Sequence, residues 1–204
     1  MEKNLNIFKN THLVSVPEKD LTTRLESSAT TSGTPSRIHI DIHTSKRQIK
    51  ASSSVMGSFL HNKRHNFFIL DSDPRKKIMP EMTARIAATR GFLILAKNYN
   101  YFMEFDLNHQ LILQIEKFIE YCESYSKNKQ SEDLLTIFGF TFIIYEYVIK
   151  IMLENKLSLD LGGTKLAHIG GWKKLNDKKV DSKKFKEDIN KTLGILSEDI
   201  VDFY

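Results

Sequence analysis

The chain of 204 residues contains one cysteine, four prolines and no long uninterrupted apolar run. Because Cys122 is the only cysteine, no disulfide can form within the chain, which fits a reducing cytoplasm. The longest apolar stretch, residues 138–153, contains Glu146 and Lys150, so it is too short and too charged to cross a bilayer. The first six residues lack the apolar segment of a signal peptide. These absences lead us to expect a cytoplasmic protein without a membrane span.

A large excess of one charge sign is also lacking, since Lys and Arg number 30 against 25 Asp and Glu, a net charge of only +5. Nucleic-acid-binding domains concentrate more positive charge than this. One basic run keeps a nucleic-acid-binding module open as an alternative, and it consists of Lys173, Lys174, Lys178, Lys179, Lys183, Lys184, Lys186 and Lys191. We interpret the run as the solvated side of a turn and a helix, and we expect no nucleic-acid partner.

Strand and helix patterns alternate along the chain. Expected strands cover residues 38–42, 67–70, 99–105, 134–138, 165–169 and 200–204. Expected helices cover 45–60, capped by Thr44 or Ser45, then 82–96, 111–125, 140–153 and 182–193, the last capped by Ser182 and ended by Gly194. The sequence therefore predicts an α/β fold with a mostly parallel sheet layered with helices.

Two of these patterns make predictions about single side chains. The helix at 45–60 is expected to place Ile49, Val55, Met56, Phe59 and Leu60 on one face. Asp71 and the pair Gly170-Gly171 follow apolar strands, at the ends where parallel sheets bind ligands.

A hydroxyl-rich turn precedes the first expected strand. In the stretch "SSATTSGTPSRIHID", from Ser27 to Asp41, seven of the first ten residues are Ser or Thr. The backbone N–H groups and hydroxyls of such a turn can cradle a phosphate, and Arg37 can add a bidentate contact. A solvated loop of small polar residues is the alternative. The stretch lacks Gly-Lys-Ser/Thr and is therefore not a Walker A loop.

Six motifs in this order resemble the LuxE-type acyl-protein synthetase family of the adenylate-forming superfamily. They are the hydroxyl-rich turn, "SRIHIDIHTSKRQIKA", "FFILDSDP", "GFTFIIYEYV", "HIGGWKKL" and "DIVDFY", and "HIGGWKKL" is the most specific. The resemblance covers residues 22–204. It implies that this segment is part of the large N-terminal domain of an adenylate-forming enzyme, with residues 1–21 as a lead-in.

The resemblance implies an ATP- and Mg²⁺-dependent ligase. The family activates a carboxylic acid, here expected to be a fatty acid, as an acyl-adenylate and transfers the acyl group to a thiol. An acyl-acceptor or reductase protein is the implied partner. The implied phosphate-binding residues are Ser27, Ser28, Thr30, Thr31, Ser32, Gly33, Ser36 and Arg37. The implied nucleotide or acyl pocket contains His168, Gly170, Gly171, Trp172, Lys173 and Tyr204, and Trp172 either stacks on the purine or packs in the core.

Two departures from the family pattern affect these implications. Without gaps, Ala29 and Ser32 replace both loop glycines, whereas a shifted alignment keeps Gly33 and shortens the loop. The sequence also stops at Tyr204, before the Gly-Met-Thr-Glu residues that the family pattern would place next. We therefore expect the chain to be C-terminally truncated and inactive alone. A non-catalytic, truncated or degenerate domain with an interaction role is the alternative.

Other clusters predict no further chemistry. The pairs His39/His43 and His61/His65 have the four-residue spacing of metal ligands, but neither pair lies within one expected helix, so we expect no metal site. Cys122 lies on the expected inner face of its helix and is interpreted as a core residue rather than an acyl carrier. No catalytic residue is assigned.

Overall fold

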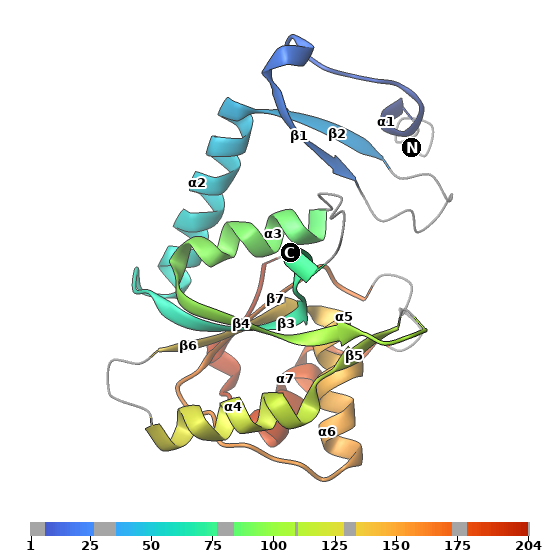
Figure 1. The fold of residues 1–204 in the computed structure, drawn as a ribbon. Coiled ribbons are helices and arrows are strands. Elements are labelled where there is room, and N and C mark those ends of the chain that lie inside the picture. The colour runs from blue at the N-terminus through green and yellow to red at the C-terminus, as the bar shows by residue number, and fades with distance from the viewer. Residues whose placement is uncertain are drawn as a thin grey trace. The chain divides into compact units, whose positions relative to one another are not determined.

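The structure is a computed structural model that describes residues 7–26, 36–76, 84–108, 110–128, 134–172 and 179–203. The chain divides into two compact units. The hairpin unit comprises Met1–Lys63 and Pro74–Leu95, and the sheet unit comprises Arg64–Asp73 and Ala96–Tyr204. The expected boundary after residue 21 falls inside the hairpin unit. Figure 1 labels the elements of both units.

The hairpin unit is built on a two-stranded antiparallel sheet of β1 and β2. Its elements are α1 (Ile7–Asn10), η2 (Glu18–Asp20), β1 (Leu21–Glu26), β2 (Arg37–Asp41), α2 (Ile42–Phe59), η3 (Pro74–Lys76), α3 (Ala84–Phe92) and η4 (Leu93–Leu95). The expected strand at 38–42 is thus present as β2, but it pairs with β1 in a hairpin and does not join the larger sheet.

The sheet unit contains six strands in the order β5-β4-β3-β6-β7-β8. Its strands are β3 (His65–Ser72), β4 (Ala96–Phe105), β5 (Leu111–Leu113), β6 (Leu135–Phe140), β7 (Lys165–Ile169) and β8 (Ile200–Asp202). Its helices are α4 (Ile115–Asn128), α5 (Thr141–Ile144), the π-helical turn η5 (Tyr145–Ile149), α6 (Lys150–Glu154), α7 (Ser182–Leu193) and η7 (Ser197–Asp199). Among the described residues of this unit, every strand pair is parallel except β4 with β5, which confirms the predicted mostly parallel α/β sheet.

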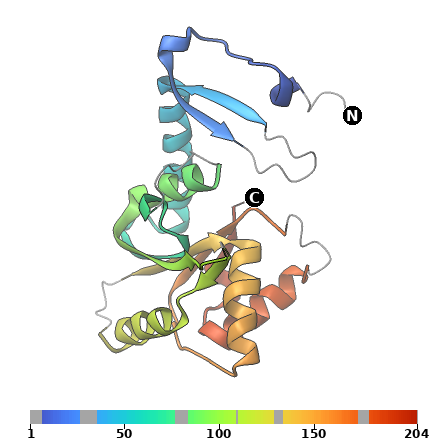
Figure 2. The ribbon, with the colours of Figure 1, turned by 45° about the vertical axis from the view of Figure 1, so that its right-hand side comes forward.

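The helices α4, α5 to α6, and α7 lie on the same side of the sheet in both views (Figure 1 and Figure 2). They share one core cluster with the strands, to which α4 contributes Phe118, η5 contributes Val148 and α7 contributes Ile189. All three side chains are fully buried, and burial of such a side chain contributes about 1.5–3 kcal/mol. Cys122 also belongs to this cluster, and burial raises the pKa of its thiol to about 12, as expected for a core residue.

One expected helix begins later than its periodicity indicates. Leu111–Leu113 pairs antiparallel with β4, so these residues form a strand and not the first helical turn. The backbone N–H of Gln114 still bonds to the carbonyl of Phe102 at 2.9 Å, and α4 starts immediately afterwards. The prediction of a helix over residues 111–125 was wrong for its first turn because strand pairing with β4 satisfies that backbone.

The predicted helix caps were each placed slightly too late. Asp41, not Thr44 or Ser45, caps α2, since its Oδ1 accepts hydrogen bonds from the N–H groups of His43 and Thr44 at 2.8 and 2.9 Å. Asp181, not Ser182, caps α7 by accepting from the N–H of Lys184 at 2.7 Å. In both helices the residue before the first helical position reaches the free N–H groups of the first turn.

The predicted inner face of α2 is only partly correct. Met56 and Leu60 are buried and Phe59 is half-buried, but Ile49 and Val55 are 43% and 55% exposed. The interior face of α7 is confirmed, because Phe185, Ile189 and Leu193 are buried and Gly194 ends the helix with φ +67°. None of the helices in the described residues is long and apolar enough to span a membrane.

Candidate functional site

The carboxyl edge of the parallel sheet contains a topological switch point. The segment after β3 leads to β4 on one side of β3, whereas the segment after β6 leads to β7 on the other side. Open α/β sheets bind ligands at such a point, outside the carboxyl ends of the two strands. Asp71 lies near the end of β3 and is buried, and Thr141 directly follows β6. These two ends define the candidate site.

The strand register aligns further residues with this edge. Leu70, Gly139, His168 and Asp202 occupy one row of neighbouring positions across β3, β6, β7 and β8. All four strands end within two residues of this row, so the polar residues in and just beyond it lie where a ligand would approach.

A hydrogen-bonded brace joins the ends of β6 and β7. The Oγ1 of Thr141 lies 2.9 Å from Nδ1 of His168 and donates to the carbonyl of Ile169 at 3.1 Å. A hydroxyl has one proton, so both contacts are satisfied together only if Nδ1 of His168 carries a proton and donates to Oγ1. The brace thus fixes the tautomer of His168 and the carbonyl that precedes Gly170.

His168 is held neutral by its surroundings. The side chain is buried, and its ring lies 4.8 Å from the ring of Phe185. Burial lowers the pKa of His168 below 6.5, and Lys186 acts in the same direction. The carboxylate of Asp202, 3.8 Å from Nδ1, opposes this shift but is half-exposed, so burial determines the direction.

Gly139, two residues before Thr141, lies where β6 packs closely against α5 and β3. A Cβ at this position would lie 3.0 Å from Cγ1 of Ile144 and 3.1 Å from Cβ of Leu70. Such distances are too short for a methyl group within a close-packed interior. The glycine therefore leaves room for Ile144 of α5 and Leu70 of β3 to pack against the end of β6.

The chain leaves β7 through two glycines in the left-handed region. Gly170 has φ +84° and Gly171 has φ +55°, values that side-chain-bearing residues adopt only at a cost. Because neither residue has a Cβ, a ligand can approach the backbone N–H groups closely here. This turn directly follows the carbonyl that Thr141 holds.

Trp172 is packed inside the sheet unit. The side chain is buried, and its ring meets that of Tyr145 edge-on at 5.3 Å. The hydroxyl of Tyr145 donates to Oδ2 of Asp188 at 2.7 Å, and Lys184 contacts the same oxygen at 2.8 Å. Burial and the bond to Asp188 raise the pKa of Tyr145. This packing favours the core alternative for Trp172, and stacking on a purine stays a prediction.

The other predicted site residues divide into two groups. Ser36 and Arg37 belong to the hairpin unit, where Ser36 is half-buried and Arg37 is exposed on β2. Outside the described residues lie Ser27, Ser28, Thr30, Thr31, Ser32, Gly33, Lys173 and Tyr204. The structure brings together His168, Gly170, Gly171 and Trp172, and it adds Thr141, whose role the sequence indicates only through its place in the Gly-Phe-Thr motif.

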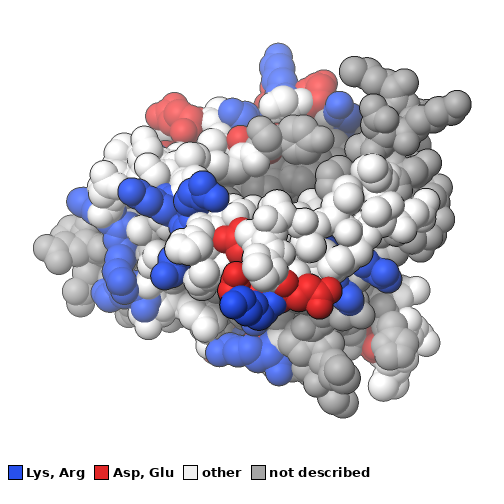
Figure 3. Space-filling view, turned by 90° about the horizontal axis from the view of Figure 1, so that it is seen from above, with Lys and Arg blue, Asp and Glu red and all other residues white. Residues whose placement is uncertain are grey.

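The described part of the basic run lies beside acidic residues. Lys183 is 3.8 Å from Glu187, Lys184 pairs with Asp188, and Lys186 donates to the carbonyl of Ser197 at 3.2 Å. On the face seen from above in Figure 3, which is not the side of α7 in Figure 1, Lys and Arg side chains likewise occur together with Asp, Glu and uncharged residues. These contacts favour the solvated-helix interpretation over a nucleic-acid surface.

Metal ligands do not gather in the part of the chain that the structure describes, where no three His, Cys, Asp or Glu side chains are close enough to hold an ion. His39 instead packs against the ring of His12, with ring centroids 4.4 Å apart.

A family model described as acyl-protein synthetase, LuxE, matches residues 4–204. No curated protein matches the chain significantly.

Proposed function

The chain belongs to the LuxE family of acyl-protein synthetases, and we propose that it serves the ATP-dependent activation of a carboxylic acid, in particular a fatty acid. In the proposed first step, a carboxylate oxygen attacks the α-phosphorus of ATP. The bond from that phosphorus to the bridging oxygen breaks, and pyrophosphate leaves with the electron pair. A thiolate then attacks the acyl carbon, and AMP leaves with the electron pair of the carbon–oxygen bond.

The brace between Thr141 and His168 is the observation that supports this proposal best. It joins the Gly-Phe-Thr and His-x-Gly-Gly-Trp motifs, which are distant in the sequence, at a switch point of the sheet. The reaction needs positioned reactants and neutralised phosphate charge, and the first step needs no protein nucleophile. We assign to the brace the task of holding the Gly170-Gly171 turn against the nucleotide. Thr141 and His168 are positioning residues in this proposal.

The phosphates require positive or hydrogen-bonding groups beyond this edge. We propose that the Ser27–Arg37 turn and Lys173 supply them, as the resemblance implies. Mg²⁺ is usually held by substrate phosphates together with one or two carboxylates, so a cluster of three protein ligands is not required. Asp202 is a half-exposed carboxylate at this edge and fits such a role. The ion would neutralise charge on the phosphates.

Calorimetry with a stable analogue of the acyl-adenylate, tetradecanoyl sulfamoyl adenosine, tests the proposal. The analogue should bind more tightly than either ATP or tetradecanoate, because it joins both groups in one molecule. Gly171→Ala should weaken binding about tenfold, because the turn of this variant relaxes in the free protein and binding must restore the left-handed backbone, which costs a Cβ-bearing residue about 1–2 kcal/mol.

Gly162→Ala is the matched control. Gly162 is outside the carboxyl edge, and a Cβ there would approach only a side-chain oxygen of Asp160, at 3.3 Å. This variant should bind the analogue as the wild type does. If the wild-type chain binds neither ATP nor the analogue, the proposed function is wrong.

A further inference from the structure

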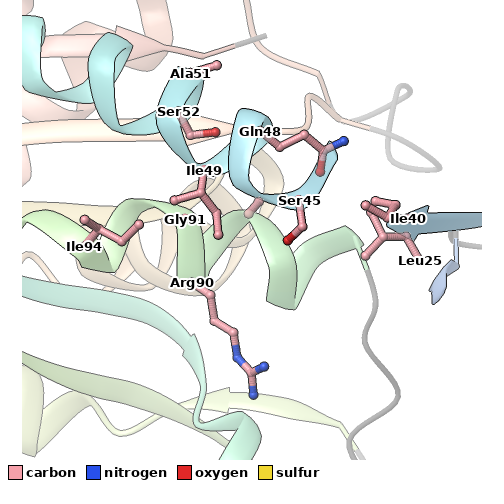
Figure 4. Close-up of a pocket in the computed structure, with 11 residues that line it drawn as sticks. Leu25, Ile40, Ser45, Gln48, Ile49, Ala51, Ser52, Arg90, Gly91 and Ile94 are labelled. Atoms are coloured by element: carbon pink, nitrogen blue, oxygen red, sulfur yellow. The ribbon is translucent and has the colours of Figure 1, made fainter. Parts of the chain in front are cut away.

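The hairpin unit contains a cavity of about 600 Å³, lined only by residues of that unit. Figure 4 shows its walls, which come from β1, β2, α2, α3 and η4. Its apolar lining consists of Leu25, Ile40, Ile49, Ala51, Ala88, Gly91 and Ile94. The volume lies within the range of about 300–1,000 Å³ that is typical of small-molecule sites.

The helices α2 and α3 approach closely along one wall of this cavity. A Cβ at Gly91 would lie 3.7 Å from Cβ of Ser52, which is ordinary van der Waals contact. In Figure 4, Ile49 on α2 lies close to Gly91 on α3. Ile49 and Ile94 remain 43% and 42% exposed, so the described protein leaves apolar surface open in the cavity. Exposed apolar surface in a concave site gains free energy when an apolar ligand covers it.

Among the described lining residues, the polar groups other than that of Arg90 carry no charge. They belong to Ser45, Gln48 and Ser52, and the one charged lining residue is Arg90. Figure 4 shows the guanidinium group of Arg90 directed away from α2. A carboxylate or phosphate inside the cavity would therefore lose hydration without meeting a cation, which is costly. The walls suit the uncharged part of a ligand.

We propose that this cavity binds the hydrocarbon chain of the acyl substrate, with the carboxyl group outside it. The inference rests on the proposed function, because the family name supplies the acyl group as the ligand. It adds the place of the chain and the residues that contact it. Ile49, Gly91 and Ile94 line the chain, and Gly91 determines how much of it the cavity admits.

Cysteine protection tests the location of the chain. The native Cys122 is buried and its pKa is raised to about 12, so it should react little with maleimide in the folded protein. Ser52→Cys places a thiol in the cavity, and Ser54→Cys places one on an exposed part of the same helix. Tetradecanoate should slow labelling of the Ser52→Cys protein several-fold and leave the Ser54→Cys protein unchanged.

A chain-length series tests the size of the cavity. Wild-type affinity for decanoate, dodecanoate and tetradecanoate should rise about fourfold per methylene group until the cavity is filled. Gly91→Leu should remove this rise and lower the affinity for tetradecanoate at least tenfold, because the added side chain occupies the cavity. Val55→Leu, at an exposed position outside the lining, should leave the series unchanged.

The outcomes separate the two proposals. If tetradecanoyl sulfamoyl adenosine binds, but neither protection of Ser52→Cys nor the effect of Gly91→Leu is observed, the acyl-cavity inference is wrong and the proposed function stands. If wild-type protein binds neither tetradecanoate nor the analogue, both are wrong. Circular dichroism checks that Gly91→Leu is folded, and protection of Ser52→Cys decides the question if it is not.

Discussion

At the scale of single residues, Thr141 is important for the edge of the sheet, because its one hydroxyl contacts two groups of the neighbouring strand β7. It meets Nδ1 of His168 and the carbonyl of Ile169, and all three groups are shielded from water to a large degree. A buried donor that loses its acceptor costs about 1–3 kcal/mol. The hydroxyl therefore matters for the stability of the sheet edge as well as for its geometry.

Thr141→Val should lower the free energy of unfolding by about 1–3 kcal/mol, because the isosteric side chain leaves Nδ1 of His168 without its acceptor. Urea denaturation measures the loss. Thr141→Ser keeps the hydroxyl and should recover most of the stability. Equal losses in the two variants would show that packing of the methyl group, and not the brace, stabilises this edge.

His168 makes stability depend on pH. Its pKa is lowered in the folded protein, so between that value and 6.5 the unfolded chain binds more protons at this residue than the folded chain does. The contribution of neutral His168 to the free energy of unfolding is therefore present in full above pH 6.5 and decreases as the pH falls below 6.5. Urea denaturation between about pH 7 and pH 5 should show a steeper loss for wild type than for His168→Gln. If wild type and His168→Gln lost stability in parallel over this pH range, the lowered pKa would not belong to His168.

At the scale of elements, the end of α7 shows how a helix terminus is satisfied by its neighbours. The carbonyls of Thr192 and Leu193 accept hydrogen bonds from the N–H groups of Leu159 and Leu161 at 2.8 and 2.9 Å. The segment before β7 thus supplies donors that the last helical turn lacks. Gly194 turns the chain away in the left-handed conformation, against this same segment.

Gly194→Ala should lower the free energy of unfolding by about 1–2 kcal/mol or more, because the residue has a positive φ. The added Cβ would also lie 3.2 Å from the carbonyl oxygen of Leu159 and from Cα of Asp160, so the backbone must shift. Thermal and urea unfolding measure the change. The comparison is Gly162→Ala, because Gly162 does not have a positive φ, and this variant should lose less free energy of unfolding. A similar loss in both variants would show that the left-handed conformation of Gly194 is not the cause.

At the scale of the whole molecule, the two units differ in how their strands are supported. The described core cluster that includes Phe118, Val148 and Ile189 belongs entirely to the sheet unit, where β3, β6 and β7 are central strands. The strands β1 and β2 form a two-stranded sheet, and such a pair has little stability of its own. The free energy needed to open the backbone hydrogen bonds should therefore be higher in the sheet unit than in the hairpin unit.

Hydrogen exchange followed by mass spectrometry should find the slowest amides in β3, β6 and β7, and faster exchange in β1 and β2. The reason is that amides in central strands beneath packed helices exchange only when much of the unit opens. Equal protection in both sets of strands would show that the chain unfolds as a single unit.

The sequence by itself determined those features that depend on local pattern. Apolar runs predicted β3 and β6, the helical spacing predicted the buried face of α7, and Gly194 predicted the end of that helix. Burial of Cys122 also followed from its position on the helical face. These predictions succeeded because burial on one face imposes a period on the residues of that face.

The tertiary structure decided which of these elements meet. The Thr141–His168 brace joins residues 27 positions apart, and no local pattern specifies that β6 and β7 are neighbours. Leu111–Leu113 satisfies a helical spacing, but pairing with β4 makes it a strand. The exposure of Ile49 likewise depends on which elements surround α2, and so does the cavity it lines. Hydrogen bonding and burial between distant segments outweigh local preference at these positions, since each residue's environment is set by the neighbours that the fold supplies.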